Sequence, residues 1–247
     1  MNESAIDNIK NPCYKLRITN GETVMSLQKI LANFKIDGEF VSCEPYGSGH
    51  INRTYCAVFN TANGKKRYIL QKINSTLFTN VDGLMNNIKL VTEFNRAEIE
   101  KRGGDPLRET LNLVYTLDGK PYFKTENGEY YRVYIFIEGA LGYDVVEKPE
   151  HFYESAVAFG KFAQLLDRFD NSQLFEVLPN FHNTVDRYNK FLAALEKNLS
   201  GRKHMALPEI NFALERKDIT GKIVSLIDKG IMPLKVTHND TKLNNVL

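Results

Sequence analysis

The chain has 247 residues, of which 43% are hydrophobic and 25% are charged. These fractions are close to the globular average and exclude a disordered, collagen-like or coiled-coil chain. Lys and Arg total 32 against 30 Asp and Glu, so the net charge of +2 gives no bulk electrostatic reason to bind nucleic acid.

The cysteines and the N-terminal residues indicate a cytoplasmic protein. Cys13, Cys43 and Cys56 are scattered without metal-ligand spacing, as is usual in a reducing compartment. The first residues lack the basic and apolar segments of a signal peptide. No uninterrupted apolar run reaches the roughly 18 residues of a membrane-spanning helix. We expect a monomer or homodimer that contacts neither membrane nor nucleic acid.

The first half of the sequence predicts a mainly antiparallel sheet. An amphipathic helix is expected at 22–34, and strands are expected at 39–46, 52–60 and 67–73. Asn63-Gly64 marks a two-residue hairpin turn between the last two of these strands.

One helix interrupts this sheet after its third strand. Apolar side chains recur every three or four residues over 81–102, which predicts a helix that ends at Gly103-Gly104. Asp118-Gly119 and Asn127-Gly128 mark two further hairpins. They join predicted strands at 111–117, 120–125 and 129–137.

The second half is predicted to be helical. Apolar residues step by three and four from Phe152 to Leu166 and from Val185 to Leu199, and a third helix is expected at 218–229. Because such periodicity ordinarily reflects burial, we expect these two stripes to be core.

A glycine-rich segment, GSGHIN at 47–52, lies between two predicted strands. A dinucleotide-binding loop would lead from a strand into a helix. A glycine loop between antiparallel strands is instead how kinases cover nucleotide phosphates, since backbone N–H groups approach closely where side chains are missing. An ordinary hairpin turn remains the alternative. The candidate nucleotide ligands here are Gly47, Ser48, Gly49 and Asn52.

The third strand offers a cation for the phosphates, as a kinase requires. Lys72 lies on the same strand face as Leu70. The register stays open, because related sequences often place the basic residue directly after the leucine, where this chain has Gln71. Glu93 on the following helix, or Glu98, is the candidate partner of the lysine.

The pattern His238-x-Asp240-x-Lys242-x-x-Asn245 is the strongest signal in the chain. A carboxylate at Asp240 can orient an attacking hydroxyl and accept its proton. The amide oxygen of Asn245 can ligate Mg²⁺, and Lys242 can neutralise charge on the transferring phosphoryl group. His238 is expected to brace the loop. Metal ligation by His238 and Asp240 is disfavoured, because no Cys or His lies nearby at ligand spacing.

With these motifs the chain resembles the aminoglycoside phosphotransferase and choline kinase group, which shares the protein kinase-like fold. Within it, the likeness is greatest to N-acetylhexosamine 1-kinases. The segments that carry it are YGSGHINRTY (46–55), YILQKIN (68–74), YRVYIFIEGALGYD (131–144), FGKFAQLLDRFD (159–170), LPNFHNTVDRY (178–188) and VTHNDTKLNNVL (236–247).

The resemblance implies an α+β fold with two lobes. Residues 1–138 would form an N-lobe of antiparallel sheet plus helix. Residues 139–247 would form part of a helical C-lobe, truncated at the catalytic loop. ATP and Mg²⁺ are the implied cofactors, with the backbone of Ile137 and Glu138 reading the adenine edge and His50, His182 and Arg187 as candidate substrate contacts.

The implied reaction is phosphorylation of a small-molecule hydroxyl. The anomeric hydroxyl of an N-acetylhexosamine is the expected acceptor. Choline, homoserine, an aminoglycoside, and a non-catalytic nucleotide-binding role are the alternatives. A kinase needs a further metal carboxylate soon after the catalytic loop, and none follows Asn245 here, so we expect these 247 residues alone to catalyse poorly.

Overall fold

The computed structural model describes residues 24–47, 49 and 51–247. The chain divides into two compact units, one up to Tyr143 and the other Asp144–Val246. The sequence places this boundary at 138/139, a few residues earlier.

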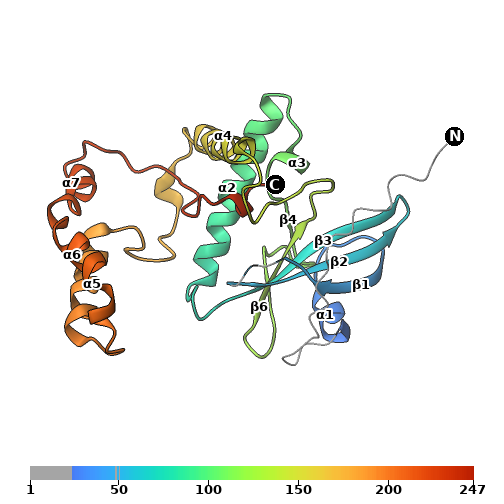
Figure 1. Ribbon diagram of the computed structural model, residues 1–247. Helices are drawn as coiled ribbons and strands as arrows, with labels where there is room; N and C mark the ends of the chain where they lie inside the picture. The colour runs from blue at the N-terminus through green and yellow to red at the C-terminus, as the bar shows by residue number, and fades with distance from the viewer. Residues whose placement is uncertain (1–23, 48, 50) are drawn as a thin grey trace. The chain divides into compact units, whose positions relative to one another are not determined.

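The first unit is built on one antiparallel sheet of six strands, in the order β1-β2-β3-β6-β4, with β5 also paired to β6 (Figure 1). The strands are β1 (Glu39–Pro45), β2 (Arg53–Thr61), β3 (Gly64–Ile73), β4 (Leu113–Val114), β5 (Phe123–Lys124) and β6 (Tyr130–Ile135). The antiparallel sheet and the expected helix after its third strand are therefore confirmed, although a second, short helix is inserted at the same place. A parallel sheet starting at the glycine loop is excluded.

The three turns expected from Asn-Gly and Asp-Gly all form. Gly64 at the β2–β3 turn and Gly128 at the β5–β6 turn have φ of 101° and 79°, a region open to glycine at little cost. Thr116 N donates to Lys120 O at 2.9 Å and closes the third turn. The expected pairing of strands 111–117 and 120–125 is wrong, however. Both shorten, and each pairs with β6 instead, because β6 is the strand buried on both faces.

One face of the sheet packs against α1 (Val24–Leu31). Leu27 and Leu31 are 1% exposed and join alternate residues of the strands, including Leu70 and Val133, in the larger core cluster. Side chains in a strand point alternately to the two faces. These residues therefore define an α1 face of the sheet.

The opposite face packs against α2 (Val81–Lys101). Met85 of α2 is fully buried with Ile73 of β3, and Tyr130 of β6 packs against this second cluster. The Asn80 side chain accepts a hydrogen bond from Gly83 N and caps the helix, as short polar side chains do at helix starts. A short helix that the sequence did not reveal, α3 (Pro106–Glu109), follows with Asp105 as its cap.

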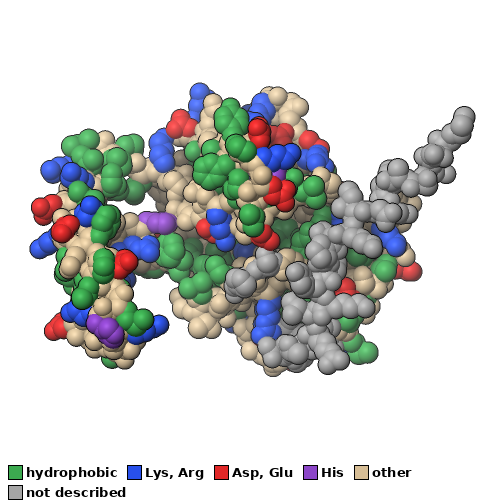
Figure 2. Space-filling model, in the orientation of Figure 1, with side chains coloured by type: hydrophobic (Ala, Val, Ile, Leu, Met, Phe, Trp, Pro, Cys, Tyr) green, Lys and Arg blue, Asp and Glu red, His purple; other side chains and the backbone are tan. Residues whose placement is uncertain are grey.

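The second unit contains four α-helices: α4 (Pro149–Leu165), α5 (Thr184–Lys197), α6 (Leu207–Leu214) and α7 (Lys222–Asp228). Three of them match expected helices, and α6 was not predicted. The expectation that the helical stripes are core is wrong for most of their residues. Leu166 is 2% exposed, but Phe152 is 68% and Leu199 92% exposed. Figure 2 shows hydrophobic side chains at the surface of this unit. Periodicity gives a helix its apolar stripe, but burial requires a second element packed on that stripe.

Candidate active site

The glycine loop joins β1 to β2 and is a hairpin connection, as expected. Tyr46 N donates to Thr54 O at 2.9 Å and closes the base of the loop. Gly47 has a φ of 78°, and a Cβ built on Gly49 would meet no heavy atom of the described residues within 4 Å. The loop backbone is thus unobstructed at Gly49. The two other predicted loop residues, Ser48 and His50, lie outside the described residues.

Asn52 fastens the end of this loop to the third strand. Its Oδ1 accepts a hydrogen bond from Asn74 N at 3.0 Å, directly after β3 ends. A buried or half-buried amide that satisfies a backbone N–H fixes the local chain path. The structure thus gives Asn52 a role in holding the loop against β3.

The strand cation proposed from the sequence lies on the α1 face. Lys72 Nζ is 2.5 Å from Glu129 Oε1, and its ammonium lies 5.8 Å from the ring centroid of Tyr131. Glu93 instead accepts a hydrogen bond from Tyr115 Oη at 2.6 Å. Lys72 and Glu93, both within the described residues, therefore do not form the expected ion pair. The physical reason is strand parity: Lys72 and α2 are on opposite sides of the sheet.

The neighbouring Gln71 occupies the α2-facing position that the sequence left open. Its Nε2 donates to Thr54 Oγ1 at 3.0 Å, and its Oε1 accepts from Arg132 Nε at 3.0 Å. Gln71 pairs directly with Arg132 in the β3–β6 register. Sequence reasoning missed Arg132, whose only signal was a lone arginine within an apolar strand.

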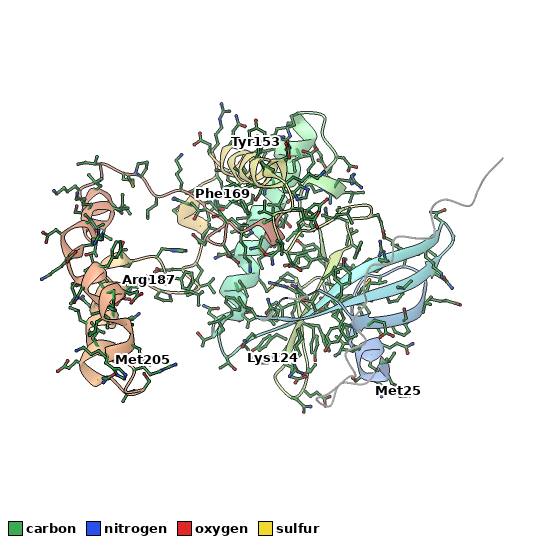
Figure 3. All side chains as sticks on the ribbon, viewed as in Figure 1. Met25, Lys124, Tyr153, Phe169, Arg187 and Met205 are labelled. Carbon is green, nitrogen blue, oxygen red and sulfur yellow. The ribbon has the colours of Figure 1, made fainter. Side chains whose placement is uncertain are left out.

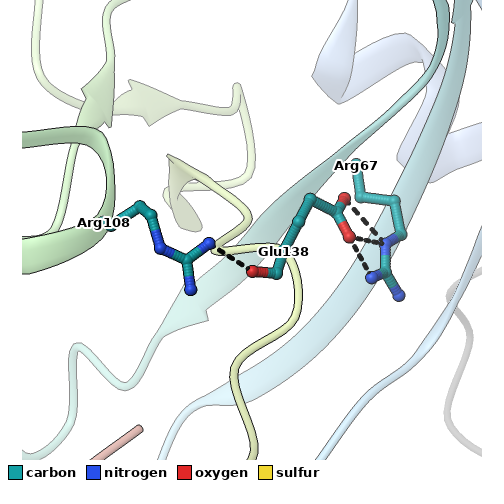
Figure 4. Close-up of polar contacts among 3 residues, drawn as sticks. All are labelled: Arg67, Arg108 and Glu138. Carbon is teal, nitrogen blue, oxygen red and sulfur yellow. Dashed lines mark hydrogen bonds and ion pairs between the residues drawn. The ribbon is translucent and has the colours of Figure 1, made fainter. Parts of the chain in front are cut away.

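The segment after β6, residues 136–139, is called the connector here, and Glu138 holds it in place (Figure 4). Its carboxylate accepts from Arg67 Nε at 3.0 and 3.1 Å and also pairs with the Arg67 terminal nitrogen. Its carbonyl oxygen accepts from Arg108 Nη1 at 2.7 Å. The hydrogen bond with Glu138 raises the pKa of Arg67 above its ordinary value. The two arginines fix the connector, and Arg108 occupies the Glu138 carbonyl that the resemblance assigned to adenine.

The other connector position keeps its backbone groups available. Phe136 N donates to Arg67 O at 3.2 Å, so the chain still runs alongside β3 at that residue. Across residues 24–47, 49 and 51–247, neither backbone group of Ile137 has a hydrogen-bond partner. Ile137 therefore presents a donor and an acceptor at the edge of the connector. Arg67 also stacks on Phe136, with 3.8 Å from its guanidinium carbon to the ring centroid.

In the second unit, the loop after residue 236 is ordered around Asp240. Asn245 Nδ2 donates to the carbonyl oxygen of Asp240 at 2.8 Å and to its Oδ2 at 2.9 Å. Lys242 Nζ lies 3.6 Å from the same Oδ2. The three residues singled out by spacing thus meet at one carboxylate. Asp240 and Lys242 are both more than half exposed, so the carboxylate is open to a reactant.

His238 supports this loop. Its Nδ1 lies 3.1 Å from the Asp240 carbonyl oxygen, a contact in which the ring nitrogen donates. Its ring also packs on Phe159 and Phe162 of α4, at centroid distances of 5.3 and 5.9 Å. The expectation that His238 braces the loop is confirmed. Asn239 between them has a φ of 64°, which asparagine tolerates better than most residues.

The chain that leads into the loop is tied to the end of α4 by residues that motif reasoning missed. Lys235 Nζ contacts the carbonyl oxygen of Asp167 at 3.0 Å and its carboxylate at 2.9 Å. This hydrogen bond lowers the pKa of Asp167. At the far end of the loop, Asn244 Nδ2 donates to Asp144 Oδ1 at 3.1 Å. The loop is therefore anchored on both sides.

The candidate substrate residues His182 and Arg187 meet around Phe181. Arg187, labelled in Figure 3, is in the first turn of α5 and donates through Nη1 to Phe181 O at 2.9 Å. The His182 ring packs edge-on against Phe181 at 4.8 Å. Asn183 caps α5 by accepting from Asp186 N at 3.0 Å, as its sequence position favours.

Within the described residues, no group of three or more His, Cys, Asp or Glu side chains could hold a metal ion. None of the helices described is long and apolar enough to cross a bilayer. The Mg²⁺ of a nucleotide complex needs no such cluster, because it is usually held by one or two protein oxygens together with the phosphates. Asn245 Oδ1 fits that role, since its Nδ2 faces Asp240 and leaves the oxygen available.

Comparison with known proteins gives a fold. No protein-family model matches the chain. The structure is similar to that of spectinomycin phosphotransferase, APH(9)-Ia, in complex with ADP and spectinomycin, with a TM-score of 0.55 and 15% sequence identity. The likeness covers 92% of this chain and 66% of that one, so the chain spans just under two thirds of that protein's length.

A second similar structure is an aminoglycoside phosphotransferase from Alicyclobacillus acidocaldarius, with a TM-score of 0.43, 14% identity, and coverage of 77% of this chain and 52% of that one. At 15% identity the first likeness concerns the fold alone. The antiparallel sheet of the first unit and the helices of the second agree with it. The chain therefore has an α+β, protein kinase-like fold like that of spectinomycin phosphotransferase.

Proposed function

We propose that this chain carries the nucleotide-binding sheet and catalytic loop of an ATP-dependent phosphotransferase that acts on a small-molecule hydroxyl. The observation that carries the proposal is the loop geometry at Asp240. Asn245 and Lys242 both reach Oδ2 of that carboxylate, which is open to solvent. A fixed, exposed carboxylate beside a cation and an amide oxygen is the set of groups that phosphoryl transfer to a hydroxyl uses.

The residues then have distinct tasks. The acceptor hydroxyl hydrogen-bonds to Asp240, which takes its proton as the oxygen attacks the γ-phosphorus. A bond forms between that oxygen and phosphorus, the bond from phosphorus to the β-phosphate oxygen breaks, and ADP leaves with that electron pair. Lys242 stabilises negative charge on the transferring group. Asn245 holds Asp240 through Nδ2 and offers Oδ1 to Mg²⁺.

The nucleotide is assigned to the first unit. The glycine loop, open at Gly49, supports backbone contact with phosphates. The backbone groups of Ile137 support recognition of the adenine edge, while Glu138 serves as the fastening of the connector. This assignment keeps Gly47, Ser48, Gly49 and Ile137 as nucleotide contacts. Lys72 and Glu93 are no longer proposed as nucleotide contacts.

For the acceptor we propose the anomeric hydroxyl of an N-acetylhexosamine. From Glu150 to Leu247 the chain has 12 acidic and 13 basic residues, a balance that favours an uncharged sugar over a polycationic aminoglycoside. His182 and Arg187, together at the start of α5, supply polar groups suited to sugar hydroxyls. His50 stays a proposed contact. The alternative acceptor is an aminoglycoside, because the similar spectinomycin phosphotransferase was solved with ADP and spectinomycin.

The proposal is tested by ADP release in the gene product that contains this chain, with N-acetylhexosamines, choline, homoserine and aminoglycosides offered in parallel. ADP release above the acceptor-free rate with an N-acetylhexosamine, abolished in Asp240→Asn, would support it. If ADP were released only with an aminoglycoside, the aminoglycoside would replace the N-acetylhexosamine as the proposed acceptor. The absence of ATP binding by calorimetry, in protein shown to be folded, would overturn the proposed function as a whole.

A further inference from the structure

Arg132 is a buried cation without a carboxylate. It lies in the middle of β6 with 9% of its surface exposed. Its Nε donates to Gln71 Oε1 at 3.0 Å, and Nη1 contacts the sulfur of Met85 at 3.8 Å. Its guanidinium carbon also lies 5.3 Å from the ring centroid of Tyr134, which is uncharged. In the described part of the chain, no Asp or Glu forms an ion pair with it. The guanidinium is therefore held by neutral groups alone.

This arrangement differs from that of Arg67 and Lys72, two of the cations on β3. Arg67 pairs with Glu138, and Lys72 pairs with Glu129. Removal of a charge from water costs several kcal/mol unless an opposite charge compensates it. Arginine retains its proton under all ordinary conditions, so it cannot escape the cost by becoming neutral. A buried arginine of this kind is best accounted for by an anion that is supplied from outside the chain.

The direction of the Arg132 side chain is fixed by neighbouring side chains on the sheet. Thr54, Gln71 and Arg132 are direct register partners across β2, β3 and β6, and their side chains form one hydrogen-bonded row on the α2 face. The row begins at Thr54, whose carbonyl oxygen closes the base of the glycine loop by accepting from Tyr46 N. The row therefore connects the strand pair that carries the loop with the guanidinium.

The end of the guanidinium is accessible. Nη2 has no hydrogen-bond partner in residues 24–47, 49 and 51–247. The buried side-chain atoms without a partner in those residues do not include Nη2, so this atom is exposed to solvent. The Nη groups of arginine form a planar fork that matches two phosphate oxygens. An anion that reached Nη2 would receive a preoriented, charge-assisted hydrogen bond.

We infer that Arg132 is the cation that binds the phosphate chain of the nucleotide, in place of a lysine on β3. The inference rests on the proposed function and names the residue that performs its phosphate contact. Lys72 cannot fill the role from the α1 face, where Glu129 neutralises it. Gln71 stands where a lysine would face α2, and it holds the arginine instead.

The test compares ATP, ADP and adenosine as calorimetric probes, in the presence of Mg²⁺, with three variants of the full chain. Arg132→Met removes the charge but keeps an unbranched side chain beside Met85. Arg132→Lys keeps the charge and removes the fork. Lys72→Met is the matched control on the other face. Thermal unfolding of every variant establishes that the protein measured is folded.

We expect Arg132→Met to weaken ATP and ADP binding by roughly 10- to 100-fold, the range for a lost hydrogen bond to a charged group. Adenosine binding should not change, and Lys72→Met should bind all three probes as the wild type does. Unchanged ATP affinity in Arg132→Met, or equal losses for ATP and adenosine, would overturn the inference. So would a loss of phosphate preference in Lys72→Met.

Two further outcomes are decisive. If Arg132→Met does not fold, Arg132→Lys should fold and bind ATP several-fold more weakly with adenosine unaffected, and wild-type ATP affinity in that variant would refute the fork contact. If the wild-type chain binds neither ATP nor adenosine, the proposed function fails, and the inference fails with it. If the wild type binds ATP and the Arg132 variants bind it equally well, the inference fails while the proposed function stands.

Discussion

Replacement of Gly49 by valine separates an effect on nucleotide binding from an effect on folding. A Cβ at this position would meet no heavy atom within 4 Å in the part of the chain that the structure describes, and the backbone there does not require positive φ. A substitution in open space usually changes the free energy of unfolding by no more than about 0.5 kcal/mol. The added side chain would instead occupy the space through which a phosphate approaches the loop backbone. We therefore expect native stability and weakened ATP binding.

The magnitude follows from the contact that is blocked. One hydrogen bond between a backbone N–H and a charged phosphate is worth about 1.5–3 kcal/mol, so the dissociation constant for ATP should rise by roughly 10- to 100-fold. Adenosine, which lacks phosphates, should bind Gly49→Val as it binds the wild type. Isothermal titration with both ligands and a thermal melt on the same sample measure all three quantities.

Gly47→Ala is the matched control. Gly47 has a φ of 78°, and a side chain in the left-handed region costs about 1–2 kcal/mol. This variant should therefore lose that much stability, although none of the described residues lies within 4 Å of its Cβ either. If Gly49→Val binds ATP with wild-type affinity, the phosphates do not contact this loop, and the ordinary hairpin turn becomes the better interpretation of residues 47–52.

Three other predictions concern the catalytic loop and the core. In the gene product that contains this chain, Asp240→Asn should fold normally and bind ATP, while kcat falls by roughly 10²- to 10⁴-fold, the usual contribution of a positioned acid–base group; near-native kcat in a stable variant would remove Asp240 from the mechanism. Asn245→Ala should raise the Mg²⁺ concentration needed for half-maximal rate as well as lower kcat, because it deletes both the oxygen proposed to bind Mg²⁺ and the two hydrogen bonds to Asp240; a magnesium dependence like that of the wild type would exclude metal ligation. Burial raises the pKa of the Cys43 thiol from 9.0 to about 12, so the folded protein should keep Cys43 unmodified by iodoacetamide at pH 8, as read by mass spectrometry of the peptide. Because the folded state favours the protonated thiol, this contribution to stability is complete below about pH 9 and is lost as the pH rises toward 12; rapid alkylation of Cys43 in folded protein would contradict its burial.

Local sequence signals determined most of the first unit. The turn residues Asn63-Gly64 and Asn127-Gly128 specify hairpins by their own backbone preferences, and these hairpins formed. The spacing of Asp240, Lys242 and Asn245 also sufficed to bring them together, because a short loop cannot carry residues two and five positions apart far from one another. Where the physics is local, the sequence was enough.

Packing between distant segments decided the rest. The pairing of β4 and β5 with β6, rather than with each other, depends on which strand is buried on both faces. The exposure of Phe152 and Leu199 depends on what covers a helix, and periodicity carries no information about that. The occupation of the Glu138 carbonyl by Arg108 joins residues 30 positions apart.

The strand cation shows the distinction most sharply. The sequence offers Lys72, next to Gln71, as the phosphate-binding residue. The amino-acid sequence does not indicate which of the two side chains faces α2. A shift of one residue in strand register moves every side chain to the other face. The register in the sheet places Lys72 over the α1 core and Gln71 beside Arg132. The choice between them belongs to the tertiary structure, because the face of a strand is defined only by what packs against it.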